Sequence, residues 1–166
     1  MDEMVTLAAQ VGAELKSHGL LLTTAESCTG GGVAFALTEI VGSSAWFERG
    51  FVTYSNEAKR DMLDVAQETL MRYGAVSEAV VREMVAGALK HSDSQVAVAV
   101  SGIAGPEGGT AEKPVGTVWL AWGIKNRVCV TRLHHLAGNR TSVREQAVRL
   151  ALEGVLALLS ERTEAG

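Results

Sequence analysis

The sequence predicts an α/β fold: a single-domain mixed β-sheet covered by helices on both faces. Three observations indicate this class. Short apolar segments alternate with amphipathic helical segments along the first part of the chain, as in strand–helix units. The segment 95–101 is dominated by Val and Ala, which is typical of a central strand buried on both faces. Two further apolar segments, 115–122 and 127–135, are separated only by a short turn and predict a hairpin.

The elements of the first half can be predicted in order. Apolar residues recur at helical spacing near the N-terminus and predict an amphipathic helix over 3–18, which Gly19 ends. An apolar strand over 20–25 follows, and a glycine-rich turn leads into the next helix. Ser55 is placed as the N-cap of a later helix, and a longer helix opens at Ser77. The other elements expected here are a helix over 33–40, a strand over 50–54 and helices over 56–63, 67–73 and 77–89.

The second half begins with the central strand over 95–101. The loop 102–114 follows and holds both prolines of the chain. A loop of this length inside a compact domain is typical of a binding loop or a mobile lid. After the predicted hairpin, with its turn at 123–126, a break at 138–140 precedes a final helix over 142–159.

Composition limits the class of protein. Hydrophobic residues make up 47% of the 166 residues and charged residues 20%, so we expect one domain over residues 1–166 with a sizeable core. The net charge of −4 and the scattered basic residues argue against binding to nucleic acid or to a membrane surface. The N-terminal residues lack the basic flank of a signal peptide, and Cys28 and Cys129 provide no disulfide framework. We therefore expect a cytoplasmic protein.

The segment 24–32 carries the most chemical information. It turns from an apolar strand into a glycine-opened helix, which leaves backbone N–H groups exposed at the positive end of the helix dipole. Such a corner favours anions, and it holds two potential nucleophiles, Ser27 and Cys28. The alternative interpretation is an ordinary strand–helix turn in which Thr29 caps the helix and glycine supplies unusual φ angles.

Between the two nucleophiles the sequence favours Ser27. A thiolate at a helix N-terminus would be reactive, so Cys28 is a real alternative. However, no neighbouring segment offers the His–Asp or His–Asn support of a cysteine amidase, and a free cysteine is commonly a small buried residue. Glu26 is expected to accept backbone N–H groups within the turn.

Five segments then occur together in order and spacing: AESCTGG at 25–31, TYSNEAK at 53–59, VSGIAGP at 100–106, KPVGTV at 113–118 and GNR at 138–140. They cover nearly the whole chain and resemble the CinA C-terminal domain family. Stand-alone members of that family hydrolyse nicotinamide mononucleotide to nicotinate mononucleotide and ammonia. The resemblance therefore implies a metal-independent amidohydrolase of pyridine-nucleotide (NAD) salvage that needs no cofactor.

The resemblance also implies Ser27 as the nucleophile and Lys59 as its general base. Tyr54, five residues before Lys59, is predicted to share or relay the proton through its phenol; the alternative is that it packs at a strand end. An ordinary lysine is protonated at neutral pH, so the role of general base requires burial or neighbouring donors that lower its pKa. Composition alone would favour a solvated Lys59 beside Arg60 on the helix surface. The positive pyridinium ring of the substrate would further disfavour a protonated lysine nearby.

The remaining site residues are predicted to bind the substrate. Backbone N–H groups in the glycine-rich turn either stabilise the oxyanion or hold the phosphate, and the glycines after β-strand 95–101 permit close approach to the nicotinamide or ribose. The guanidinium of Arg140 suits phosphate beside a helix N-terminus, although Asn139 stands where the family usually has Asp. The binding candidates are Thr29, Gly30, Gly31, Ser101, Gly102, Gly105 and Arg140.

Two questions stay open at this level. The chain is either the amidohydrolase or a catalytically inactive nucleotide-binding or regulatory module of the same family. Its few aromatic residues, among them Trp46, Trp119 and Trp122, either pack the core or form an interface between subunits. We expect a homo-oligomer, a dimer or higher.

Overall fold

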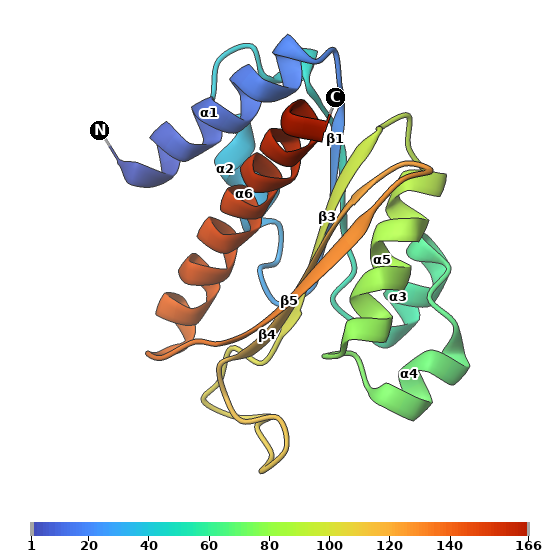
Figure 1. Cartoon of the computed structure of the whole chain (residues 1–166). Helices are drawn as coiled ribbons and strands as arrows, with labels where there is room; N and C mark the ends of the chain where they lie inside the picture. The colour runs from blue at the N-terminus through green and yellow to red at the C-terminus, as the bar shows by residue number, and fades with distance from the viewer. Residues whose placement is uncertain (1, 166) are drawn as a thin grey trace.

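Five β-strands form one mixed sheet in the order β2-β1-β3-β4-β5 (Figure 1). The computed structural model describes residues 2–165, and side chains for residues 2–161. β1 runs parallel to β2 and β3, whereas β4 runs antiparallel to β3 and β5. The strands are β1 (Leu22–Glu26), β2 (Phe47–Val52), β3 (Val96–Gly102), β4 (Thr117–Ile124) and β5 (Cys129–His135).

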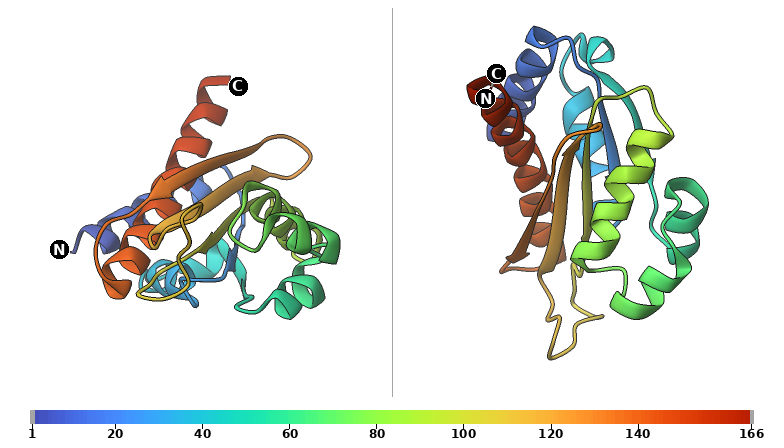
Figure 2. Two further views of the ribbon diagram at one scale, coloured as in Figure 1. Left: turned by 90° about the horizontal axis from the view of Figure 1, so that it is seen from below. Right: turned by 45° about the vertical axis from the view of Figure 1, so that its right-hand side comes forward.

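Helices cover both faces of this sheet, which confirms the predicted α/β class (Figures 1 and 2). Helices α1, α2 and α6 pack on one face, and α3, α4 and α5 pack on the other. A short 3-10 turn at Ser43–Ala45 precedes β2. The helices are α1 (Glu3–Ser17), α2 (Gly32–Thr38), α3 (Asn56–Leu63), α4 (Gln67–Tyr73), α5 (Glu78–Lys90) and α6 (Arg140–Ala165).

The central strand β3 divides the core into two layers. Successive side chains of a strand point to opposite faces, so its valines and alanines separate by parity. Val96, Val98 and Val100 pack on the α1–α2–α6 side, and Ala97 and Ala99 pack on the α5 side. The small alanines allow α5 to lie close to the sheet.

Two tryptophans belong to this core. Trp46 is buried against Gly12 of α1, where a Cβ atom would come within 2.5 Å of the indole ring. Trp122 is buried against Gly154 of α6, and its Nε1 donates to the carbonyl oxygen of Ala151 at 2.8 Å. The core interpretation of these two aromatic residues is therefore confirmed.

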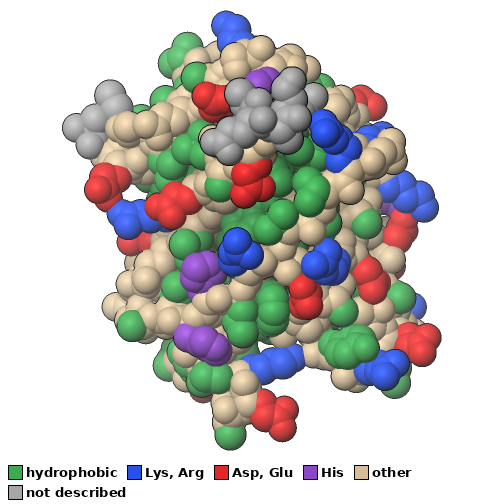
Figure 3. Space-filling model, in the orientation of Figure 1, with side chains coloured by type: hydrophobic (Ala, Val, Ile, Leu, Met, Phe, Trp, Pro, Cys, Tyr) green, Lys and Arg blue, Asp and Glu red, His purple; other side chains and the backbone are tan. Residues whose placement is uncertain are grey.

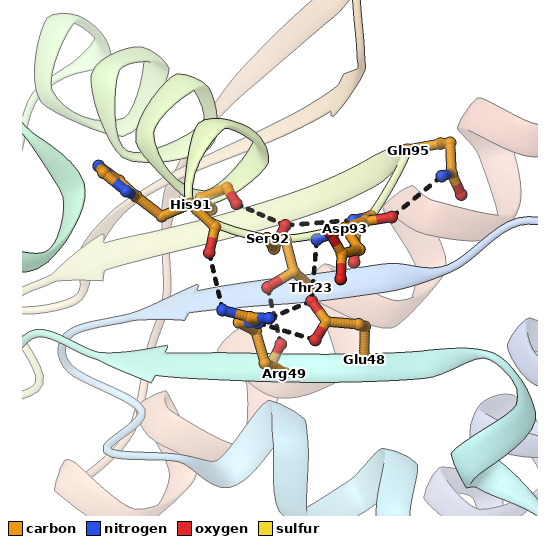
Figure 4. A network of polar contacts seen from close by, with 9 residues as sticks. Thr23, Glu48, Arg49, His91, Ser92, Asp93 and Gln95 are labelled. Carbon is orange, nitrogen blue, oxygen red and sulfur yellow. Dashed lines mark hydrogen bonds and ion pairs between the residues drawn. The ribbon is translucent and has the colours of Figure 1, made fainter.

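β2 begins at Phe47, earlier than the predicted strand over 50–54. Two of the three missed residues, Glu48 and Arg49, are polar, which an edge strand tolerates because none of its residues is fully buried. Arg49 Nε pairs with Glu48 at 2.7 Å, and its Nη1 donates to the carbonyl oxygen of His91 at 2.9 Å (Figure 4). The hydrogen bond to His91 connects the edge strand to the C-terminal end of α5.

β4 and α6 also differ in their bounds from the predictions. β4 covers Thr117–Ile124 rather than 115–122, because its last residue pairs with Val96, where the buried strand β3 begins. The turn of the hairpin therefore moves to residues 125–128. α6 begins at Arg140, two residues earlier than predicted.

The C-terminal ends of the three parallel strands lie together at one edge of the sheet. The N–H of Ser27, just after β1, donates to the carbonyl oxygen of Val100 in β3 at 3.0 Å. The N–H of Thr53, just after β2, donates to the carbonyl oxygen of Glu26 at 2.7 Å. In open α/β sheets ligands bind at the C-terminal ends of the parallel strands.

Among the helices of residues 2–165, none has the length and hydropathy of a membrane-spanning segment.

Candidate active site

The buried carboxylate of Glu26 shapes the turn after β1. It accepts the N–H groups of Val33 at 2.8 Å and Ala34 at 3.0 Å, and the hydroxyl of Thr29 at 2.6 Å. A negative charge at a helix N-terminus also interacts favourably with the helix dipole. The predicted role of Glu26 as an acceptor of backbone N–H groups is confirmed.

Ser27 and Lys59 are hydrogen-bonded partners. The Nζ of Lys59 lies 2.9 Å from the Oγ of Ser27. The same Nζ donates to the carbonyl oxygen of Thr53 at 2.9 Å, and a longer contact of 3.5 Å reaches the carbonyl oxygen of Tyr54. Helix α3, capped by the Ser55 hydroxyl, carries Lys59 on its buried side. The two side chains, 32 positions apart in the sequence, are therefore brought together by the tertiary structure, in which α3 packs against α5.

The surroundings of Lys59 increase the fraction of its neutral form relative to an ordinary lysine. The side chain is only 1% exposed. Burial lowers the pKa of its ammonium from 10.5 to about 8, while the charge of a Cys28 thiolate would act in the opposite direction. Desolvation penalises the charged form, so the neutral amine is more abundant at neutral pH by roughly two orders of magnitude than in an ordinary lysine. The amine can then accept a proton from Ser27.

Cys28 lies in a different environment. Its thiol belongs to the hydrophobic core, where a Cβ atom on Gly102 would come within 3.2 Å of its Sγ. Burial, together with the charge of Glu26, raises the pKa of the thiol to about 11. A thiol with this pKa stays protonated at neutral pH, which favours Ser27 over Cys28 as the nucleophile.

The turn retains backbone donors that the fold does not use. The N–H of Gly30 donates to the carbonyl oxygen of Ser27 at 3.0 Å, and Glu26 occupies the first N–H groups inside α2. The N–H groups of Cys28, Thr29 and Gly31 have no acceptor among the described residues. Because its hydroxyl proton is donated to Glu26, the N–H is the donor that Thr29 can offer to a ligand. The positive φ angles of Gly30 (59°) and Gly31 (102°) give the turn its shape.

Tyr54 and Arg140 contact each other at the outer part of the site. Arg140 Nη2 lies 3.2 Å from the Tyr54 hydroxyl, and Nη1 donates to the carbonyl oxygen of Gly105 at 2.9 Å. The Tyr54 side chain is 62% exposed. Among the described contacts, Tyr54 reaches Lys59 through its main-chain carbonyl and not through its phenol. The proton-relay role of the phenol stays a prediction.

Asn139, which stands where the family usually has Asp, has a structural role at the start of α6. The Asn139 Oδ1 accepts the N–H of Ser142 at 2.9 Å and so caps the first turn of α6. Asn and Asp are equally good at this position, and the guanidinium of Arg140 is oriented by Gly105 and Tyr54 instead.

Three other predicted binding residues lie at the end of β3 and in the loop that follows it, and each has a packing role. The buried Ser101 hydroxyl donates to the carbonyl oxygen of Ala75 at 2.8 Å. A Cβ atom on Gly102 would come within 2.7 Å of Val118, and one on Gly105 within 2.4 Å of Val115. Gly105 also has a positive φ of 83°. Their contacts with substrate stay predictions.

Two basic residues without a predicted role in the site form hydrogen bonds to backbone carbonyl oxygens far away in the sequence. Arg144 Nε donates to the carbonyl oxygen of Cys28 at 3.1 Å. The signal was its spacing of four residues from Arg140, which puts both arginines on one side of α6. Lys113, in the loop after β3, donates through Nζ to the carbonyl oxygen of Tyr73 at 2.5 Å and so connects this loop to the end of α4.

Two other kinds of candidate site are a metal-binding group and a cavity away from Ser27. Among the described residues, no group of three or more His, Cys, Asp and Glu side chains could hold a metal ion. A cavity of about 530 Å³ lies between α5 and the β4–β5 hairpin, and its lining contains none of the predicted site residues. Acidic and basic side chains are interspersed on the face shown in Figure 3.

Known proteins share this sequence and fold. The chain is 57% identical over 152 residues to the nicotinamide-nucleotide amidohydrolase PncC of Escherichia coli (strain K12), covering 92% of each chain. It is 52% identical to the PncC of Pseudomonas putida, covering 97% of this chain and all of that one. The crystal structure of the competence/damage inducible protein CihA from Agrobacterium tumefaciens superimposes with a TM-score of 0.92 at 50% identity, covering 95% and 96% of the two chains. The family model of the CinA C-terminal domain matches residues 4–159, and the chain therefore belongs to this family.

Proposed function

We propose that this protein is a metal-independent amidohydrolase that converts nicotinamide mononucleotide to nicotinate mononucleotide and ammonia in NAD salvage. The observation that carries the proposal is the 2.9 Å contact between Ser27 Oγ and the buried Nζ of Lys59. The names of the relatives that are 57% and 52% identical support the substrate class.

The reaction begins with proton transfer within this pair. Neutral Lys59 takes the proton of Ser27 as the Oγ attacks the carboxamide carbon, and a tetrahedral oxyanion forms. The unused N–H groups of Cys28, Thr29 and Gly31 are the candidate donors for this oxyanion. Lys59 then returns the proton to the amide nitrogen, the C–N bond breaks and ammonia leaves.

The second half of the cycle removes the acyl group from Ser27. A water molecule gives a proton to Lys59 and attacks the ester carbon, and the resulting intermediate expels the Ser27 oxygen, which recovers its proton from Lys59. The products are nicotinate mononucleotide and the free enzyme. No cofactor takes part in these steps.

The rest of the substrate is proposed to lie between the glycine-rich turn and the first turn of α6. Arg140 supplies charge for the phosphate, and Tyr54 lies next to it with an exposed ring. Ser101, Gly102 and Gly105 flank the nicotinamide or the ribose. In this arrangement a protein of net charge −4 meets an anionic group through local donors.

The proposal is tested by ammonia release from nicotinamide mononucleotide in the presence of a chelator. We expect the wild-type protein to be active, and Ser27→Ala and Lys59→Ala each to lose activity by at least about a hundredfold. Lys125→Ala, which alters an exposed lysine in the β4–β5 turn, is the matched control and should keep full activity.

A wild-type protein that binds the mononucleotide without releasing ammonia would contradict the enzymatic proposal and support a nucleotide-binding module. Activity that the chelator abolishes would contradict the metal-independent mechanism. Retained activity in Lys59→Ala would remove Lys59 from the role of base.

A further inference from the structure

We propose that Arg144 is a positioning residue for the candidate active site: it holds the peptide group between Cys28 and Thr29, so that the Thr29 N–H is oriented and strengthened as an oxyanion donor. The inference rests on the proposed function. It concerns a residue that touches neither Ser27 Oγ nor Lys59 Nζ in the described contacts, and that acts through the backbone next to the nucleophile.

The geometry places Arg144 directly on the turn. Its Nε donates to the carbonyl oxygen of Cys28 at 3.1 Å, across 116 positions of sequence. On its other side the guanidinium reaches Gly30, where a Cβ atom would lie 3.3 Å from Nη2. A side chain at Gly30 would therefore crowd the guanidinium.

The charge of Arg144 is directed at this carbonyl. Among the residues whose side chains are described, no carboxylate forms an ion pair with Arg144. This distinguishes it from Arg149 on the same helix, whose Nη2 pairs with Glu3. A hydrogen bond from a charged donor is roughly twice as strong as one between neutral groups.

The effect reaches the reaction through one peptide group. In a trans peptide the C=O of Cys28 and the N–H of Thr29 point in opposite directions, so fixing the carbonyl fixes the direction of the N–H. A hydrogen bond accepted at the carbonyl also polarises the group and makes its N–H a better donor. The Thr29 N–H has no acceptor among the described residues, so it is available for the oxyanion.

The turn needs such an external contact because of its glycines. Gly30 and Gly31 have positive φ angles, and glycine has more backbone freedom than other residues. Glu26 fixes the helix side of the turn through Val33 and Ala34. Arg144 fixes the side next to Ser27.

Steady-state kinetics with nicotinamide mononucleotide separate this role from substrate binding. In Arg144→Gln we expect kcat to fall by about 10- to 100-fold with KM changed less than about threefold, because an oxyanion donor acts in the transition state. Arg144→Lys should retain an intermediate kcat. Arg149→Gln, a matched change on the same helix, should leave kcat and KM unchanged. A raised KM with unchanged kcat would make Arg144 a substrate ligand and overturn the proposal, as would wild-type kinetics.

Amide hydrogen exchange provides a readout that needs no activity. The Gly30 N–H is bonded to the carbonyl oxygen of Ser27, so its exchange rate reports how firmly the turn is held. We expect faster exchange at Gly30 in Arg144→Gln than in wild type or Arg149→Gln, at an unchanged melting temperature. Unchanged exchange would overturn the positioning role. If wild type releases no ammonia, the proposed function fails, while the exchange result still decides whether Arg144 orders the turn.

Discussion

At the scale of single residues, the site depends on where one amine and one thiol are buried. Burial removes Lys59 from solvent and lowers its pKa to about 8, while its Nζ keeps hydrogen bonds to the Ser27 hydroxyl and the Thr53 carbonyl oxygen. Cys28, the next residue along the chain from Ser27, is buried among apolar groups, and its pKa rises to about 11. The two neighbouring candidate nucleophiles therefore differ in their surroundings: Ser27 contacts the amine of Lys59, and Cys28 lies in the apolar core.

The pKa of Lys59 predicts the pH dependence of the reaction. The base must be neutral, so kcat/KM for nicotinamide mononucleotide should rise about tenfold per pH unit below about 8 and level off above it. Initial rates between pH 6.5 and 9.5 measure this profile, with Lys125→Ala as the control that should share it. A profile that is flat across this range would contradict the assignment of Lys59 as the base.

At the scale of elements, α6 links the end of the sheet to the site. It packs on α1 and on strands β3 and β4, and its first two turns carry Arg140 and Arg144 to the loop after β3 and to the turn after β1. The Asn139 cap determines where this helix begins. The positions of both arginines therefore depend on a helix terminus.

Removal of the cap tests this dependence. Asn139→Ala should lower the free energy of unfolding by about 1 kcal/mol, because the N–H of Ser142 loses its acceptor. Asn139→Asp should keep the stability of wild type or slightly exceed it, because an aspartate caps equally well and favours the helix dipole. Urea denaturation of the two variants measures the difference. Equal stability of the Ala and Asp variants would show that the cap contributes nothing.

At the scale of the whole molecule, two layers of helices enclose the sheet (Figure 2). The site lies where the parallel strands end. The burial that prepares Lys59 for its role has a cost in stability, because the folded state holds its proton less tightly than the unfolded chain does. Between pH 8 and 10.5 Lys59 binds more protons in the unfolded chain than in the folded protein. The contribution of Lys59 to the free energy of unfolding therefore increases as the pH rises through this range.

This linkage can be measured against Lys59→Met. The difference in unfolding free energy, wild type minus variant, should shift in favour of wild type by a few kcal/mol between pH 7 and pH 10.5. The variant also leaves the Thr53 carbonyl oxygen without its donor, but this loss is the same at both pH values. Denaturant unfolding at the two pH values gives the shift. A difference that does not change with pH would mean that the pKa of Lys59 is the same in the folded and unfolded states.

The sequence alone determined the fold class and most of the elements. The Val–Ala segment of β3, the Ser55 cap and the helix start at Ser77 are local signals, and the strand and the two helices that they predict occur where expected. The predicted bounds of strands differ from the observed ones where hydrogen bonding to a neighbouring strand determines where a strand begins or ends. β2 starts in a polar segment because its edge position tolerates Glu48 and Arg49, and β4 is set by its register with β3.

Ser27 and Lys59 were both predicted as site residues from the sequence. The resemblance of the motifs to a family predicted that the two residues act as a pair, which their spacing in the sequence does not indicate. Only the tertiary structure decided that Lys59 is buried, that Cys28 faces the core and that Arg144 reaches the turn after β1. A pKa and a hydrogen bond depend on which groups surround a side chain. For a pair 32 positions apart, or an arginine 116 positions from its acceptor, those surroundings are created by the packing of helices on the sheet and not by local sequence.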